Sequence, residues 1–194
     1  MRRSSSVERD RSIKLDLDVG VYAPAEDTLL MLSALEVKKG ERALEVGCGS
    51  GYLAVHMAKA GALVTATDID PLAVANTKRN AILNGVEMTV LEGDLFQNID
   101  GRYDVIVFNP PYLRGIAEGQ EDLCWAGGEK GTEMTARFLE GAKDHLAPDG
   151  RVLIIVSSDV DPAALERAMR GWEHTVLAAQ TLFFERLDVM ELRH

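Results

Sequence analysis

A stretch of residues that could do chemistry, Asn109-Pro110-Pro111-Tyr112, follows the apolar run from Tyr103 to Phe108. The run has the character of a β-strand, and the two prolines end it because proline cannot donate a hydrogen bond to a neighbouring strand. Each proline also pushes the residue before it towards extended backbone geometry, so Asn109 is held in a restricted conformation. In open α/β sheets ligands bind at this carboxyl end of the strands. The tetrapeptide therefore predicts a rigid site that presents an amide, although a stiff turn around a buried Asn is the alternative.

A glycine-rich turn, Gly47-Cys48-Gly49-Ser50-Gly51, follows a short predicted strand and precedes a helical pattern. Glycines at alternate positions allow a tight turn and let a ligand approach the backbone N–H groups. The signal is weak alone, because several kinds of nucleotide site share it. Dinucleotide sites require the spacing Gly-x-Gly-x-x-Gly, which this turn does not have, so hydride chemistry is the less favoured alternative.

Carboxylates stand at the ends of the first three predicted strands. Glu45 precedes the glycine-rich turn, Asp68 ends the second strand, and Asp94 follows the third. Because the carboxyl ends of parallel strands lie at one edge of a sheet, these side chains are candidates for a common site. The alternative is that Asp68 and Asp94 only cap the elements that follow them.

The elements that must position these residues alternate between strand and helix. Strands are predicted over 42–46, 63–67, 88–91, 103–108, 151–156, 172–179 and 184–192, and helices over 24–35, 52–60, 70–84, 132–146 and 161–169. The alternation argues for parallel strands with right-handed crossovers. We expect a Rossmann-like α/β fold with a mostly parallel seven-stranded sheet, helices on both faces and an antiparallel C-terminal strand pair. Residues 113–130 are expected to form a long functional loop.

Length and composition indicate one globular domain. The chain has 194 residues, 46% hydrophobic and 27% charged, with a basic N-terminal segment over 1–18 that we expect to be flexible and a single domain over 19–194. No apolar run is long enough to span a membrane, and the N-terminus lacks the apolar core of a signal peptide, so we expect a cytoplasmic protein. The net charge of −10 weighs against a duplex nucleic acid as partner.

Cysteine and histidine spacing does not favour a metal site. Cys48 and Cys124 lie far apart without the spacing of zinc ligands, which indicates free thiols in a reducing compartment. The four histidines also lack a metal-binding spacing, so no metal is expected.

Together, the glycine-rich turn preceded by Glu45 and the second strand ending at Asp68 resemble the S-adenosylmethionine site of Rossmann-like class I methyltransferases. A carboxylate at the end of the second strand can accept hydrogen bonds from both ribose hydroxyls. The resemblance implies that Asp94 accepts from the adenine amine and that Ile69 and Leu95 flank the ring. The cofactor-binding residues assigned in this way are Glu45, Gly47, Gly49, Gly51, Asp68, Ile69, Asp94, Leu95 and Asn109, and the product would be S-adenosylhomocysteine.

With a methyl donor in place, Asn109 and Pro110 acquire a specific role. The nitrogen of an amide or an aromatic amine delocalises its lone pair, and this pair must attack the sulfonium methyl group. The Asn109 side-chain oxygen and the Pro110 carbonyl would each accept a hydrogen bond from one N–H of this nitrogen. These two bonds would align the nitrogen with the methyl group and favour positive charge on nitrogen. Tyr112 would pack against a planar substrate group.

Asn-Pro-Pro-Tyr in such a fold resembles the signature of enzymes that methylate planar nitrogen. Tyr22-Ala23-Pro24-Ala25-Glu26-Asp27-Thr28, Trp125-Ala126-Gly127-Gly128 and the short chain are similar to the HemK-like branch that modifies archaeal and eukaryotic class I translation release factors. The target in that branch is the glutamine side-chain amide of a Gly-Gly-Gln motif. The resemblance places Thr28 near the methionine end of the cofactor and implies that Asn109 to Tyr112 hold the target amide. It also places Trp125 at the mouth of the pocket, although a role in packing is an equal alternative for this residue.

The alternative substrate is the exocyclic amine of adenine in DNA or RNA, which the same tetrapeptide suits. An acidic, short chain disfavours it, because such enzymes need a basic groove and must hold a flipped base. A non-catalytic module is disfavoured by the intact tetrapeptide. The resemblance also implies a small zinc-containing activator protein that covers an apolar edge of the sheet.

Overall fold

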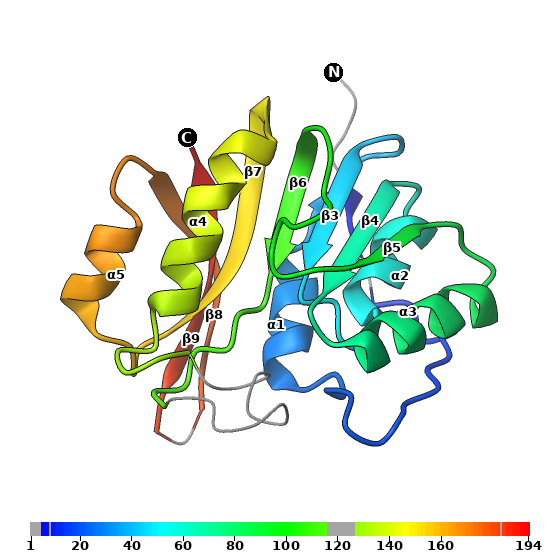
Figure 1. Cartoon of the computed structure of the whole chain (residues 1–194), viewed down its shortest axis with the longest axis horizontal. Coiled ribbons are helices and arrows are strands. Elements are labelled where there is room, and N and C mark those ends of the chain that lie inside the picture. The colour runs from blue at the N-terminus through cyan, green and yellow to red at the C-terminus, as the bar shows by residue number, and fades with distance from the viewer. Residues whose placement is uncertain (1–4, 8, 116–126, 183) are drawn as a thin grey trace.

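A seven-stranded sheet forms the centre of the fold (Figure 1). The structure is a computed structural model, and it describes residues 5–7, 9–115, 127–182 and 184–194. The strands of the sheet are β3 (Arg42–Val46), β4 (Leu63–Asp68), β5 (Thr89–Glu92), β6 (Tyr103–Phe108), β7 (Leu146–Ser157), β8 (Glu173–Thr181) and β9 (Arg186–Arg193). They lie in the order β5-β4-β3-β6-β7-β9-β8, parallel from β5 through β7 and antiparallel where β9 pairs with β7 and β8. The predicted sheet, including its antiparallel C-terminal pair, is confirmed.

Helices cover both faces of this sheet, as expected. The helices are α1 (Glu26–Ala34), α2 (Tyr52–Lys59), α3 (Pro71–Leu83), α4 (Glu133–His145) and α5 (Pro162–Ala168). Side chains alternate along β6: Val105 and Val107 pack with α1 and α2, whereas Ile106 and Phe108 pack with Phe138 of α4. The central strand therefore contributes to two separate hydrophobic cores. Among the described residues, no helix is both long and apolar enough to cross a membrane.

The boundary of the fifth parallel strand differs from the prediction. The sequence predicts a turn over 148–150 and a strand from Arg151, but β7 begins at Leu146, directly after α4. Its pairing with β6 shifts register between Tyr103, opposite Leu146, and Val105, opposite Arg151. The extra residues of β7 are thus accommodated as an irregularity within the strand.

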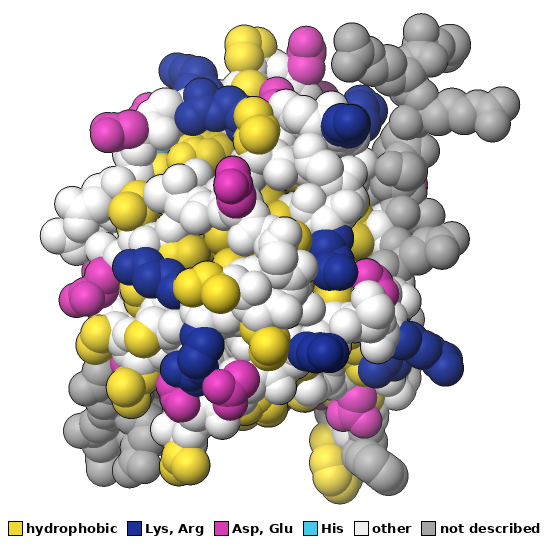
Figure 2. Space-filling view, turned by 90° about the vertical axis from the view of Figure 1, so that its right-hand side faces the viewer, with side chains coloured by type: hydrophobic (Ala, Val, Ile, Leu, Met, Phe, Trp, Pro, Cys, Tyr) yellow, Lys and Arg dark blue, Asp and Glu magenta, His cyan; other side chains and the backbone are white. Residues whose placement is uncertain are grey.

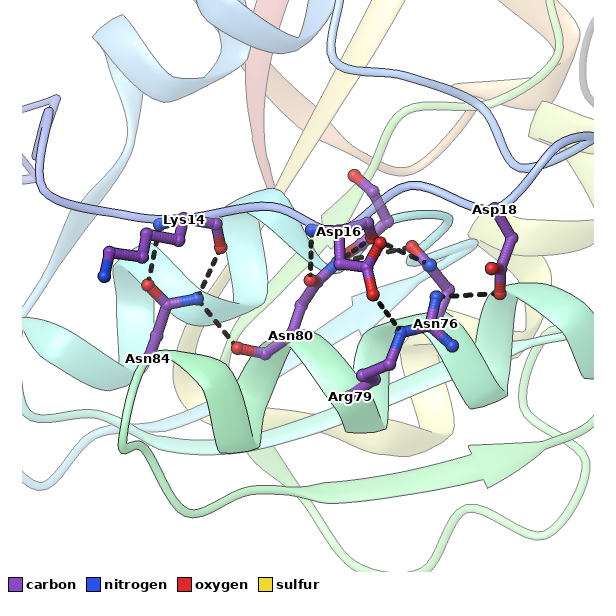
Figure 3. Close-up of polar contacts among 8 residues, drawn as sticks. Lys14, Asp16, Asp18, Asn76, Arg79, Asn80 and Asn84 are labelled. Carbon is purple, nitrogen blue, oxygen red and sulfur yellow. Dashed lines mark hydrogen bonds and ion pairs between the residues drawn. The ribbon is translucent and has the colours of Figure 1, made fainter.

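The N-terminal segment lies against the body of the protein. β1 (Ser5–Ser6) pairs antiparallel with β2 (Glu36–Val37), and Val7 is buried. Residues 10–18 are here called the N-terminal strap, and the part from Lys14 to Asp18 runs along α3 (Figure 3). The Asn84 side chain exchanges two hydrogen bonds with the backbone of Lys14, of 2.9 and 2.7 Å. One helical turn earlier, the Asn80 side-chain oxygen accepts from the Asp16 N–H at 2.8 Å.

Buried amides hold the strap more firmly than its charges do. Asn76 and Asn80 are fully buried, and both donate from Nδ2 to the Asp16 carbonyl, at 2.9 and 3.1 Å. Arg79 forms ion pairs with Asp16 and Asp18, but these side chains are exposed and such pairs contribute little. The structure thus places Lys14, Asp16 and Asp18 in contact with α3, whereas Asp10 contacts His56 and Lys59 of α2. The predicted flexibility of residues 1–18 and the domain boundary at residue 19 stay predictions.

Candidate active site

A cavity of about 390 Å³ opens at the carboxyl ends of β3, β4, β5 and β6. Its size is in the range of small-molecule sites. The predicted site residues that line it are Thr28, Glu45, Gly47, Gly49, Asp68, Ile69, Asp94, Leu95, Asn109, Pro110, Pro111 and Tyr112. Gly51 does not line the cavity, and Trp125 lies outside the described residues.

Glycine is required in the turn after β3 because the backbone there is left-handed and tightly packed. Gly47 has φ +65°, and a Cβ on it would lie 3.3 Å from the Phe108 ring. Gly51 has φ +74°, and a Cβ on it would lie 2.8 Å from the Thr77 side chain. Thr77 also donates from Oγ1 to the Gly49 carbonyl at 3.0 Å. Gly51 therefore shapes the turn and packs it on α3, and its predicted contact with the cofactor stays a prediction.

Glu45 lies beneath this turn and is buried. Its Oε2 accepts from the Ala54 N–H at 2.7 Å, which joins β3 to α2. Burial raises the pKa of Glu45 to about 8, and the neighbouring Asp68 carboxylate contributes in the same direction. A cationic group brought into the cavity would favour the ionised form of Glu45.

Asp68, at the end of β4, faces the same turn. Its Oδ2 accepts from the Gly49 N–H at 2.8 Å and its Oδ1 from the Asp70 N–H at 3.0 Å. Burial raises its pKa. A carboxylate has about four acceptor sites, so each oxygen retains capacity for one more donor. Asp68 can therefore accept two neighbouring hydroxyl groups of a ligand.

The far end of the cavity combines Asp94 and Leu95 with a residue that the sequence analysis missed. The Arg137 guanidinium of α4 lies 2.6 Å from Asp94 Oδ2, and both residues line the cavity. Leu95 has φ +53°, a left-handed conformation that is rare for a branched side chain and is a sign of a functional constraint. Arg137 had no local signal in the sequence, because it lies on a helix far from Asp94 along the chain.

Asn109 ends β6 and presents its amide to the cavity. Its Nδ2 donates to Asp27 Oδ2 at 2.9 Å. Its Oδ1 is buried and has no hydrogen-bond partner among the described residues. Buried polar atoms are nearly always paired, so an unpaired acceptor on a residue that lines a cavity is an indication of a ligand donor.

Asp27 was quoted in a motif but not predicted as a site residue. It is the second residue of α1, it is 5% exposed, and it lines the cavity. The Tyr22 hydroxyl donates to Asp27 Oδ2 at 2.9 Å, and the Thr28 N–H donates to Oδ1 at 2.6 Å. Its position between Glu26 and Thr28, after a proline, also suits a helix start, and this second explanation hid it.

Gly127 packs closely against the backbone of the tetrapeptide. A Cβ on Gly127 would lie 2.6 Å from the Pro111 carbonyl oxygen and 3.0 Å from Tyr112 Cα. Burial raises the pKa of the Tyr112 hydroxyl, and the Asp27 and Glu185 carboxylates add to this effect. The described end of the predicted functional loop thus packs against the predicted catalytic stretch.

The charges of the cavity restrict its ligand. Five acidic residues line it, Asp27, Glu45, Asp68, Asp70 and Asp94, and Arg137 is the basic residue that also lines it. This distribution repels the pyrophosphate of a dinucleotide and attracts cationic groups and hydroxyl or amine donors. Within the described part of the chain, no cluster of His, Cys, Asp and Glu could hold a metal ion.

Comparisons with known proteins agree with this geometry. The family model described as "Methyltransferase small domain" matches residues 14–183. A protein of Methanocaldococcus jannaschii named "putative protein N5-glutamine methyltransferase" is 41% identical over 151 residues, which are 75% of this chain and 77% of that protein. Methyltransferase HEMK2 of Mus musculus is 35% identical over 193 residues and covers 88% of each chain.

A solved structure shares the fold. The E. cuniculi Mtq2–Trm112 complex, described as responsible for methylation of the eRF1 translation termination factor, has a TM-score of 0.70 at 21% identity. The alignment covers 90% of this chain and 99% of that chain. The family model and the relatives in sequence confirm the resemblance to HemK-like methyltransferases that the motifs indicated. The chain belongs to the methyltransferase small domain family.

Proposed function

We propose that this protein transfers a methyl group from S-adenosylmethionine to the glutamine side-chain amide of a Gly-Gly-Gln motif in a class I translation release factor. The observation that carries the proposal is the buried, unpaired Oδ1 of Asn109, a residue that lines the cavity at the carboxyl edge of the sheet. An acceptor fixed at this point suits an N–H donor on a planar nitrogen.

The cavity fits the cofactor. Asp68 has acceptor capacity for the ribose hydroxyls, and Asp94 can accept from the adenine amine beside Ile69 and Leu95. Glu45 and the other acidic residues favour the cationic methionine end, near which we place Thr28. Bound S-adenosylmethionine supplies an electrophilic methyl carbon and leaves as S-adenosylhomocysteine.

The residues of this chain would act on the acceptor nitrogen by orientation. Asn109 Oδ1 and the Pro110 carbonyl would each accept one N–H of the substrate amide, which aims the nitrogen at the methyl group. The same two dipoles would stabilise the positive charge that develops on nitrogen. Tyr112 would pack against the planar amide. The nitrogen then loses one proton to water, so this mechanism needs no covalent intermediate.

Glutamine is favoured over a nucleic acid amine by charge and by the relatives. The net charge of −10 opposes a phosphate backbone, and a relative with 41% identity is named for N5-glutamine methylation. Release factors act on ribosomes, so we place the activity in the cytoplasm.

The proposal is tested with S-adenosylmethionine labelled in its methyl group. The chain is incubated separately with an archaeal or eukaryotic class I release factor, with the same factor carrying Gly-Gly-Glu, and with DNA and RNA. We expect label only in the Gly-Gly-Gln factor, because the carboxylate of Glu lacks an N–H donor. Label in nucleic acid alone would overturn the substrate that we propose.

We extend the proposal to a small activator protein of the zinc-containing kind, bound at the edge of the sheet formed by β5 and α3. β5 is an edge strand, and large apolar side chains are exposed nearby, including Leu72 at 52% and Ile82 at 81%. Figure 2 faces this side of the molecule and shows apolar side chains between Lys and Arg side chains. The Mtq2–Trm112 complex, which shares the fold, also contains a second protein, Trm112.

A further inference from the structure

The orientation of the Asn109 amide is chemically ambiguous until a neighbour fixes it. An amide has two donor hydrogens at one end and an acceptor at the other, and a rotation by half a turn exchanges them. A donor facing the substrate N–H groups would repel them. The proposed reaction therefore requires that Oδ1, and not Nδ2, face the cavity.

Asp27 is the neighbour that can impose this orientation. Asn109 Nδ2 donates to Asp27 Oδ2 at 2.9 Å, which leaves Oδ1, a buried acceptor without a hydrogen-bond partner among the described residues, at the other end of the amide. The Asp27 carboxylate already accepts hydrogen bonds from the Tyr22 hydroxyl and the Thr28 N–H. Because a carboxylate only accepts, it pairs with Nδ2 of Asn109 and would repel Oδ1.

The two residues come from elements that are far apart along the chain. Asp27 lies on α1 and Asn109 follows the end of β6, and both residues line the cavity. Asp27 is 5% exposed, so water competes little for its oxygens. A simple helix-start role explains an acidic residue at this position but does not require contact with Asn109.

We propose that Asp27 is a positioning residue that fixes the amide polarity of Asn109 and thereby makes the site an acceptor for N–H groups. This inference rests on the proposed function for its consequence in catalysis. The contact between Asp27 and Asn109 itself can be tested without any methyl acceptor.

The test compares Asp27→Asn with Glu26→Gln. Both changes remove one negative charge from the first turn of α1, but Glu26 is exposed and does not line the cavity. With Asp27→Asn we expect the single-turnover rate to fall by about 10- to 100-fold, in analogy with loss of a residue that orients a catalytic group. The KM for the substrate and the melting temperature should change little, because the side chain keeps its shape. Glu26→Gln should retain the wild-type rate.

An exchanged pair separates polarity from structure. Asn109→Asp alone places two carboxyl groups side by side, whereas Asp27→Asn with Asn109→Asp restores a donor opposite an acceptor. We expect the double variant to react at least several-fold faster than Asn109→Asp alone. A double variant that is no faster than Asn109→Asp would overturn the proposal.

An activity-independent readout distinguishes failure of this inference from failure of the proposed function. In the wild type the Asn109 side-chain amide protons, identified by their loss in Asn109→Asp, should give one hydrogen-bonded NMR signal. Asp27→Asn should shift it towards the position of a free amide, and Glu26→Gln should not. An unchanged signal in Asp27→Asn would overturn the inference. Absence of methylation of the Gly-Gly-Gln factor by the wild type would instead overturn the proposed function alone.

Discussion

At the scale of single residues, the site consists of groups whose ordinary properties are altered by burial. Glu45 holds a proton at neutral pH, and Asn109 leaves an acceptor unpaired. Neither state would be favourable in a chain selected for stability alone, since each buried group costs free energy. A cationic cofactor would instead favour the ionised form of Glu45, and an N–H donor would pair with the Asn109 acceptor.

Replacing Asn109 by Ala should slow the methyl-transfer step without weakening the binding of the cofactor. The loss of one acceptor that is fixed for the transition state costs about 10²–10³ in rate at comparable sites. Single-turnover kinetics would measure this loss, and calorimetry with S-adenosylhomocysteine would measure affinity. An unchanged single-turnover rate would remove Asn109 from the role that we assign.

The raised pKa of Glu45 predicts how stability depends on pH. An unfolded Glu titrates near 4.5 and the folded one near 8, so between these values the folded state binds more protons than the unfolded state. The free energy of unfolding should therefore fall as pH rises from about 4.5 to 8, by at most about 1.4 kcal/mol per pH unit from this group.

Glu45→Gln provides the comparison, because the amide oxygen can still accept from Ala54 but does not titrate. Urea denaturation of both proteins from pH 5 to 8, without cofactor, should give a difference in favour of the variant that grows with pH. Parallel pH curves would contradict the assigned ionisation of Glu45.

At the scale of elements, the N-terminal strap and α3 connect the surface of the protein to the cofactor cavity. Asn80 Nδ2 donates to the Ser50 carbonyl of the glycine-rich turn at 2.9 Å as well as to the strap. Beyond the strap, Gly20, Val21 and Tyr22 line the cavity. One side chain of α3 therefore contacts both the glycine-rich turn and the strap that leads to these cavity residues.

Asn80→Ala should weaken cofactor binding by about tenfold, because about 1–3 kcal/mol is lost when a buried partner such as the Ser50 carbonyl is left unpaired. Asn84→Ala is the matched control, since Asn84 contacts the strap at Lys14 but, within the described part of the chain, makes no side-chain hydrogen bond to the glycine-rich turn. Both variants should speed proteolysis of the strap. Calorimetry should show reduced affinity only for Asn80→Ala, and equal affinities in the two variants would refute the coupling.

At the scale of the whole molecule, alternation and strand-end chemistry allowed most of the fold and site to be predicted. Strand ends at Asp68 and Asn109 are local signals, because proline and acidic residues follow apolar runs directly. The contacts that escaped prediction join residues far apart in the chain, such as Arg137 with Asp94 and the strap with Asn80. Their formation depends on how the folded elements pack, and no short pattern records it.

A charged side chain introduced at the β5 edge should disrupt binding of an activator protein there without affecting the folding of the chain. Ile82→Asp changes a side chain that is 81% exposed, so it should leave the melting temperature nearly unchanged. If an activator of the Trm112 kind covers this edge, the variant should lose co-elution with that protein in size-exclusion chromatography. Retained co-elution would place the partner elsewhere.

The paired acceptors at Asn109 and Pro110 also bear on how the reaction ends. An unmodified amide offers two N–H hydrogens to two acceptors, whereas a monomethylated amide offers only one. The product therefore leaves one buried acceptor unpaired, which weakens its hold by about 1–3 kcal/mol relative to the substrate. The site would release its product readily and stop at one methyl group, because a second round would begin with the nitrogen held at a single point.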